Sequence, residues 1–167
     1  VTEGFEDGAL PYGWEILAVS GQPWVVYNSS FSAHTGTFSV KGPWTSAGAE
    51  SWLILPELQL TSGDFLNFWM DGSSSAGTDV EVYISTRGNL PTDFTTMLAS
   101  YVAGVNMPTV YAPISIDLAE YADVNAFVAL KLVDANGNSV YVDDFLMPPL
   151  APVETDVLPL LISEIVV

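Results

Sequence analysis

The sequence predicts an all-β fold, a two-sheet antiparallel β-sandwich of the jelly-roll type. Short apolar or alternating segments recur roughly every ten residues, and Gly, Pro, Ser and Asn separate them. No window of useful length repeats its apolar residues with the period of a helix, and the best helical segment, 118–124, is one turn long. So many short strands in one domain imply two packed sheets.

Eleven segments have the composition of strands. Each is alternating or continuously apolar, and turn residues bound it. In chain order they are Thr2–Glu6, Trp14–Val19, Trp24–Tyr27, Thr37–Lys41, Glu50–Leu55, Asp64–Asp71, Asp79–Thr86, Met97–Val102, Thr109–Asp117, Ala126–Asp134 and Ser139–Met147. Between the last two, Asp134–Asn138 contains Asn136–Gly137, a pair that readily takes positive φ, which predicts a tight hairpin turn.

The chain divides into a domain and a short C-terminal region. Its 167 residues fit one domain, which we expect to span residues 1–148. The Pro-rich stretch 149–156 predicts a stiff, extended linker. Residues 157–167 form an apolar, β-prone segment with three possible roles: the last strand of this domain, the first strand of a following domain, or a strand donated to a neighbouring subunit. Donation would be carried by Leu160, Ile162 and Ile165.

Charge and composition exclude several classes of partner. With 3 Lys and Arg against 20 Asp and Glu, the formal net charge of −17 is opposite to what nucleic-acid binding requires. No apolar run approaches the length of a membrane span, so we expect no membrane insertion. The absence of cysteine excludes disulfides and the common structural zinc sites. Strong acidity with 49% hydrophobic residues fits a folded protein in a salty, cation-rich medium.

Two carboxylate motifs lie within predicted strands or beside them: Phe5–Gly8 near the start, and Asp143–Asp144 in the last strand. Adjacent carboxylates repel one another unless a cation neutralises them, and Lys and Arg are scarce in this chain. Ca²⁺ takes hard oxygen ligands and tolerates irregular geometry. We therefore expect a structural Ca²⁺ that joins the first and last strands through Glu6, Asp143 and Asp144. The alternative is that these are solvated side chains at strand ends.

Six motifs in a fixed order carry a resemblance to a known family. They are Phe5–Trp14, Ser32–Ser39, Trp52–Leu58, Val82–Thr86, Ile116–Tyr121 and Val142–Phe145. Over about residues 3–147 the series resembles the cleaved-adhesin and choice-of-anchor J modules of secreted bacterial proteins, including the gingipain haemagglutinin repeats. The resemblance implies a jelly-roll β-sandwich, secretion, structural calcium, and an adhesive or accessory role rather than catalysis.

The resemblance also implies which residues hold the calcium. Its Phe-Glu motif places Glu6 as a ligand, and its Asp-Asp motif places Asp143 and Asp144. Main-chain carbonyls of the Thr35–Gly36 loop complete such sites, and His34 contributes through its carbonyl.

The tryptophans indicate where a ligand would bind, because flat aromatic rings stack on sugar faces. Three of them lie in apolar strand segments and are expected in the core: Trp14, Trp52 and Trp69. Trp44 lies in a loop with no strand pattern and is the first choice for an exposed ligand contact, with Trp24 as the second.

Nothing in the sequence predicts an enzyme. His34 is the only histidine, no nucleophile elbow is present, and small sandwiches rarely form the deep cleft that glycoside hydrolysis needs. The leading hypothesis is therefore a non-catalytic, calcium-stabilised, secreted or cell-surface module that binds a glycan or an extracellular protein. The alternative is a structural subunit of an extracellular filament or sheath, a homo-oligomer assembled through a donated strand at 157–167.

Overall fold

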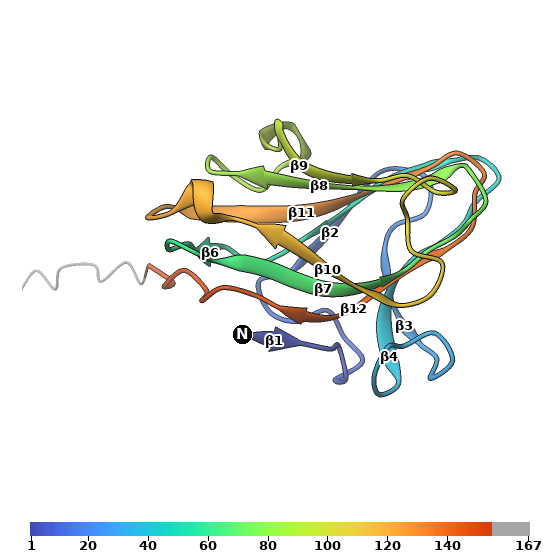
Figure 1. The fold of residues 1–167 in the computed structure, drawn as a ribbon, viewed down its shortest axis with the longest axis horizontal. Coiled ribbons are helices and arrows are strands. Elements are labelled where there is room, and N and C mark those ends of the chain that lie inside the picture. Colours follow the sequence, from blue (N-terminus) through green and yellow to red (C-terminus); the bar gives the residue numbers. More distant parts are fainter. Residues whose placement is uncertain (155–167) are drawn as a thin grey trace, which may run out of the picture.

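Two antiparallel sheets packed face to face make up residues 1–154, the part of the chain that this computed structural model describes (Figure 1). They contain twelve strands and two three-residue 3-10 helices, Pro91–Asp93 and Ala119–Tyr121. Within these residues there is no α-helix, and no helix is long and apolar enough to cross a membrane. The predicted all-β sandwich is confirmed.

Each sheet contains six strands. The first sheet has the order β10-β7-β12-β4-β3, with β1 paired to β12. Its strands are β1 (Thr2–Glu3), β3 (Val25–Asn28), β4 (Phe38–Gly42), β7 (Phe65–Asp71), β10 (Ala112–Asp117) and β12 (Val140–Leu146). The second sheet has the order β2-β5-β11-β8-β9, with β6 paired to β11. Its strands are β2 (Glu15–Ser20), β5 (Ala49–Ile54), β6 (Leu58–Gln59), β8 (Thr78–Ser85), β9 (Thr96–Tyr101) and β11 (Asn125–Asp134).

From β4 onward the chain passes repeatedly from one sheet to the other, which is the wrapping pattern of a jelly roll. Strands β4, β7, β10 and β12 lie in the first sheet, whereas β5, β8, β9 and β11 lie in the second. Each of the eleven predicted strands has a counterpart in the structure. Only β6, two residues long, had no signal in the sequence.

The predicted hairpin at Asp134–Asn138 is a tight turn of a different kind. Asn136 has φ 70°, as an Asn-Gly pair favours, but the turn joins β11 of the second sheet to β12 of the first. The buried Asp134 carboxylate accepts hydrogen bonds from the N–H groups of Gly137 (2.9 Å) and Thr45 (2.8 Å). These bonds fix the turn as a crossing between the sheets, so the hairpin prediction was wrong in its connectivity.

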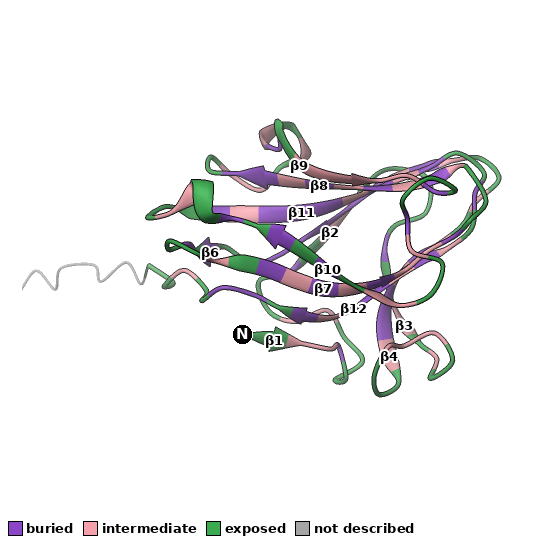
Figure 2. Cartoon of the chain, in the orientation of Figure 1, coloured by how far each residue is buried: buried purple, intermediate pink, exposed green. Residues whose placement is uncertain are grey.

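Alternating side chains fill the space between the two sheets. In β7, Leu66, Phe68 and Met70 are buried, and in β8 Val80 and Val82 are buried, while the residues between them are half-buried (Figure 2). This pattern follows from the two-residue period of a strand, in which successive side chains point to opposite faces. The alternation that predicted the strands therefore also defines the core.

A smaller apolar cluster lies on the outer face of the second sheet. Trp52 and Ile54 alternate with Leu53, which lies in the main core, so they project from the opposite side of β5. Phe94, from the segment between β8 and β9, stacks on Trp52 with the ring centroids 5.4 Å apart. Phe127 of β11 packs against the same cluster. The second sheet therefore has apolar contacts on both of its faces.

The first and last strands meet at one edge. β1 pairs with β12, and Thr2 lies opposite Leu146. Next to this pair, the Val1 amino group donates to the Met147 carbonyl (2.9 Å) and the Met147 N–H donates to the Val1 carbonyl (2.7 Å). The predicted link between the ends of the domain thus begins as an ordinary antiparallel ladder.

The start of the predicted linker is paired with the sandwich. The Gln59 N–H donates to the Pro149 carbonyl (2.8 Å), and the Ala151 N–H donates to the Glu57 carbonyl (2.8 Å). Residues 149–151 therefore extend the second sheet beside β6 and are not a free linker. The whole of the apolar segment 157–167, the subject of the assembly hypothesis, lies outside the described residues.

Candidate functional site

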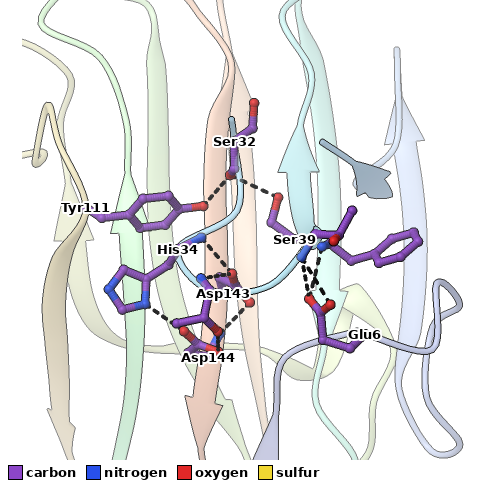
Figure 3. A network of polar contacts seen from close by, with 10 residues as sticks. Glu6, Ser32, His34, Ser39, Tyr111, Asp143 and Asp144 are labelled. Atoms are coloured by element: carbon purple, nitrogen blue, oxygen red, sulfur yellow. Dashed lines mark hydrogen bonds and ion pairs between the residues drawn. The ribbon is translucent and has the colours of Figure 1, made fainter. Parts of the chain in front are cut away.

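The loop between β3 and β4, residues 29–37, lies across the outer face of the first sheet (Figure 3). The carboxylates that the sequence predicted as metal ligands contact this loop. Three carboxylates hold this loop: Asp143 and Asp144 from β12, and Glu6 from the segment after β1. We call these side chains and the loop the carboxylate network. The sequence predicted that Glu6, His34, Asp143 and Asp144 lie together, and the structure places all four in this network.

Asp143 is the centre of the network and is completely buried. One carboxylate oxygen accepts hydrogen bonds from the N–H groups of His34 (2.8 Å) and Thr35 (3.3 Å), and the other accepts from the Asp144 N–H (2.7 Å). Burial raises the pKa of the Asp143 carboxyl from the ordinary 3.8 to about 6, and the charge of Asp144 adds to this, while the three N–H donors hold it down.

Asp144 reaches the same loop because β12 is irregular at this point. Neighbouring side chains in a regular strand point to opposite faces. Here Asp144 has φ 48°, and the register between β12 and β7 shifts between Asp143 and Leu146. This bulge turns Asp144 toward the loop, where its oxygens contact His34 Nδ1 (2.6 Å) and accept a hydrogen bond from the Thr35 hydroxyl (2.8 Å).

Glu6 holds the other end of the loop. Its carboxylate accepts hydrogen bonds from the N–H groups of Thr37 (3.1 Å) and Phe38 (3.0 Å). Phe5 lies in the core with φ 60°, and its ring makes an edge contact with Trp14, centroids 5.3 Å apart. Because Phe5 is anchored inward, Glu6 is presented at the surface beside the loop.

Close packing explains the glycine in this loop. Gly36 has φ 63°, and a Cβ at this position would overlap the Glu6 carboxylate. Only glycine combines the positive φ with the missing side chain that the contact requires. The Thr35–Gly36 pair singled out in the sequence therefore has a clear structural role.

The ring of His34 packs on aromatic residues that sequence reasoning did not connect with it. It stacks on Trp69 with the centroids 3.9 Å apart and lies 5.2 Å from the ring of Tyr111. The Tyr111 hydroxyl donates to the Ser32 carbonyl (2.6 Å). Burial, reinforced by the charge of Asp143, raises the pKa of Tyr111 well above its ordinary value. These aromatic residues come from β7 and the segment before β10, far away in the sequence, so no local pattern marked them.

No lysine or arginine neutralises the network. Lys41 lies over the ring of Tyr27, 4.5 Å from its centroid, and Lys131 lies 3.8 Å from both Glu50 and Glu81. Arg87 forms no ion pair within residues 1–154. The predicted scarcity of cations around the paired aspartates therefore holds for the part of the chain that is described.

The network satisfies part of what a calcium site needs. Its donors are carboxylate oxygens, and a buried carboxylate next to a second one favours a cation. Yet within residues 1–154 no group of three or more His, Asp and Glu side chains is close enough to hold a metal ion, and main-chain N–H groups face the carboxylates. Side chains alone thus do not define a metal site here.

The tryptophans divide differently from what the sequence predicted. Trp44 is 50% exposed, and Trp14 and Trp52 are buried, as expected. Trp24 is 1% exposed, and its ring nitrogen donates to the Ser51 carbonyl (3.2 Å), so the expectation of a surface contact there is corrected. Trp69, expected in the core, lies on the outer face of β7 under His34.

The proposed assembly residues Leu160, Ile162 and Ile165 lie outside the described residues. Their role remains a prediction from the sequence.

Known proteins share this architecture. The K1 cleaved adhesin domain of Lys-gingipain from Porphyromonas gingivalis W83 aligns with a TM-score of 0.72 over 90% of this chain and 98% of that one, at 20% identity. A family 61 carbohydrate-binding module in complex with β-1,4-galactotriose aligns with a TM-score of 0.61 over 86% of this chain and 92% of that one, also at 20% identity. Both likenesses concern the fold.

A relative by sequence is Hemagglutinin A of Porphyromonas gingivalis, which is 24% identical over 173 residues, 86% of this chain but 6% of that protein. The chain therefore spans a small part of this relative's length. The fold is that of a β-sandwich module, which it shares with the cleaved adhesin domain of Lys-gingipain. The Cleaved Adhesin Domain family matches residues 1–147, and the chain belongs to this family.

Replacing Gly36 by alanine tests how tightly the loop is held. Gly36→Ala should lower the free energy of unfolding by more than the ~1–2 kcal/mol that a positive φ alone costs alanine, because the new Cβ meets the Glu6 carboxylate. Gly63→Ala is the matched control, since Gly63 has φ +83° and no atom within 4 Å of an added Cβ. Urea unfolding of both variants provides the comparison, and equal losses would contradict the contact.

The raised pKa of Asp143 predicts a defined pH dependence in metal-free protein. The folded state binds the proton more tightly (pKa about 6) than the unfolded chain (3.8), so the stabilisation from protonation is complete below about pH 4 and lost as pH rises through 6. The Asp143→Asn variant has no ionisable group at position 143, and it keeps every other acidic residue of the native protein. The stability of the native protein relative to Asp143→Asn should therefore fall between pH 4 and 7 in chelator. A constant difference would show that the pKa of Asp143 is ordinary.

Proposed function

We propose that this chain is a non-catalytic extracellular binding module whose exposed surface contacts a glycan or an extracellular protein. The observation that carries the proposal is that the residues best suited to catalysis have a structural role. The only histidine of the sequence and the two consecutive aspartates, Asp143 and Asp144, are engaged in holding the loop 29–37 on the first sheet. What remains at the surface is suited to recognition.

A catalytic role lacks the necessary geometry. The Nδ1 atom of His34 contacts Asp144, and within residues 1–154 no serine or threonine hydroxyl is hydrogen-bonded to the ring, so no nucleophile is activated there. Asp143 is buried beneath the loop and cannot act across a cleft with a second carboxylate. The network is therefore best explained as a structural element.

The ligand class rests on the relatives and on the charge. Adhesin domains, a haemagglutinin and a carbohydrate-binding module share the fold or the family. The formal net charge of −17 disfavours nucleic acids and other polyanions. We assign the chain to the secreted or cell-surface proteins on the same basis, as the cleaved adhesin resemblance implies.

Trp44 supplies one candidate contact with such a ligand. Its side chain is half exposed. The main-chain N–H of Trp44 donates to the Ser139 hydroxyl (3.1 Å), which fixes the backbone of the loop that carries the ring. A fixed loop that presents a large ring has less conformational entropy to lose on binding.

Calcium binding at the carboxylate network is part of the proposal. Asp143 and Asp144 offer hard oxygen donors, neither contacts a lysine or arginine, and Asp143 is wholly buried. The remaining ligands would be main-chain oxygens of the loop 34–36 and the carboxylate of Glu6, which would have to move closer, because no three His, Asp and Glu side chains of residues 1–154 lie close enough to hold a metal ion. Bound Ca²⁺ would supply the positive charge that the chain lacks here.

Calcium should stabilise the fold by mass action. At about 100 times its Kd the ion adds ~2.7 kcal/mol, which raises the Tm by roughly 5–10 °C in differential scanning calorimetry. Asp144→Asn should abolish this rise, whereas the exposed control Glu120→Gln should keep it. NaCl at matched ionic strength separates binding from screening. Identical melting of chelated and calcium-loaded protein would remove calcium from the proposal.

Ligand binding is tested by screening the protein against a glycan array and a panel of extracellular matrix proteins. Trp44→Ala should weaken binding of a recovered ligand about tenfold, the effect of one lost aromatic contact with its burial. Phe65→Ala is the control, because Phe65 is an exposed aromatic residue on β7, outside both the loop of Trp44 and the carboxylate network. A native protein that binds nothing would contradict the function, while an unaffected Trp44→Ala would contradict only the role of that residue.

A further inference from the structure

A groove of about 620 Å³ lies beside the second sheet, away from the carboxylate network. Its lining includes Tyr12, Glu15, Asn89, Asn125, Phe127 and Leu150. The volume lies within the ~300–1,000 Å³ usual for ligand pockets. Nothing in the proposed function so far uses this groove.

One wall is a turn that presents an exposed aromatic ring. The Trp14 N–H donates to the Pro11 carbonyl (3.1 Å), and Gly13 has φ +86°. A Cβ on Gly13 would lie 2.9 Å from Pro56, so the turn sits tightly on the segment after β5. Tyr12 lies at the tip and is 90% exposed. A large ring on a tightly seated turn is ready to contact a ligand without ordering the backbone first.

A second wall is the segment after β12. The Ala151 N–H donates to the Glu57 carbonyl (2.8 Å), and Leu150 bridges to Leu58 of β6. These backbone contacts place Leu150, 41% exposed, along the groove. This wall is therefore attached to the second sheet through its backbone.

The central strand of the second sheet provides the remaining side. Asn125 and Phe127 are two residues apart on β11 and so share one face of the strand. Phe127 packs on the outer apolar cluster around Trp52, which fixes its ring. Asn89, from the loop after β8, lines the groove near them.

The lining combines two aromatic rings with amides and carboxylates. Within residues 1–154 the side chains of Tyr12, Asn89 and Asn125 make no hydrogen bond to protein, so their polar groups are available to a ligand. The lining also contains the carboxylates of Glu15, Glu57 and Glu154, and it contains no lysine or arginine. An anionic ligand would meet uncompensated negative charge here.

We propose that this groove binds a neutral pyranose oligosaccharide. The inference rests on the proposed function and gives it a site and a ligand class. Sugar hydroxyls both donate and accept, so they pair with amides as well as carboxylates, and the apolar face of a pyranose packs on a ring such as Tyr12. A cationic peptide would use only the carboxylates and would leave Asn89 and Asn125 without a role.

The groove is well separated from Trp44. The loop that carries Trp44 precedes β5, whereas Pro56 and Glu57 follow it, and the six residues of β5 span about 20 Å. The two candidate contacts therefore lie at opposite ends of this strand and are tested independently.

Calorimetric titration of the native protein with cellotriose, β-1,4-galactotriose, maltotriose, lactose and sialyllactose tests the inference. At least one neutral sugar should bind. Tyr12→Ala and Asn125→Ala should each weaken this binding about tenfold, while the exposed control Val105→Ala, outside the groove, leaves it unchanged. Sialyllactose should bind at least about tenfold more weakly than lactose because of the lining carboxylates.

The outcomes separate the site from the function. If a neutral sugar binds with the same affinity to Tyr12→Ala and Asn125→Ala, the groove assignment is overturned and the binding function stands. If the native protein binds neither the sugars nor any ligand of the array, the groove assignment and the proposed binding function are both overturned. If a hexa-arginine peptide binds in a manner sensitive to Tyr12→Ala and no sugar does, the groove is a cation site and the glycan assignment is wrong.

Discussion

The buried carboxylate of Asp143 is the constraint around which one whole face of the sandwich is organised. Removing a carboxylate from water is costly unless hydrogen bonds replace those of the solvent. Here three main-chain N–H groups supply them, and two of these belong to the loop 29–37. The loop must therefore lie on β12 with its main-chain N–H groups facing Asp143. Its position in turn stacks the ring of His34 on Trp69, which is half-buried, and brings the Tyr111 hydroxyl to the Ser32 carbonyl.

The two faces of the molecule thus have different kinds of chemistry. On the first sheet, carboxylates and aromatic rings hold the loop 29–37 in place, and their hydrogen-bonding groups are engaged with that loop. On the second sheet, an apolar cluster around Trp52 fixes the outer face, and amides, carboxylates and a ring lie around a groove with their polar groups unpaired within the described residues. A sandwich permits this division because each sheet shares one face with the core and has the other free.

The sequence was most informative where a single physical signal dominates. Two-residue alternation located eleven strands, and the adjacency of Asp143 and Asp144 drew attention to the network. The bulge that turns Asp144 to the loop depends on pairing with β7, which no local pattern encodes. The expectation for Trp24 was wrong because its backbone and ring nitrogens donate to Ser51, 27 residues away, and no local pattern encodes such a contact. The groove gathers residues from five separate segments, so it left no motif.

The meeting of the first and last strands has a mechanical consequence. Because Val1 lies beside Met147 and β1 runs antiparallel to β12, tension applied at the two ends would peel these strands apart one pair at a time, which is a weak geometry. Peeling would soon reach Phe5, anchored in the core, and then Glu6, bonded to the loop. The stretch from Phe5 to Glu6 would therefore act as a latch that stops the separation of β1 from spreading into the rest of the sandwich.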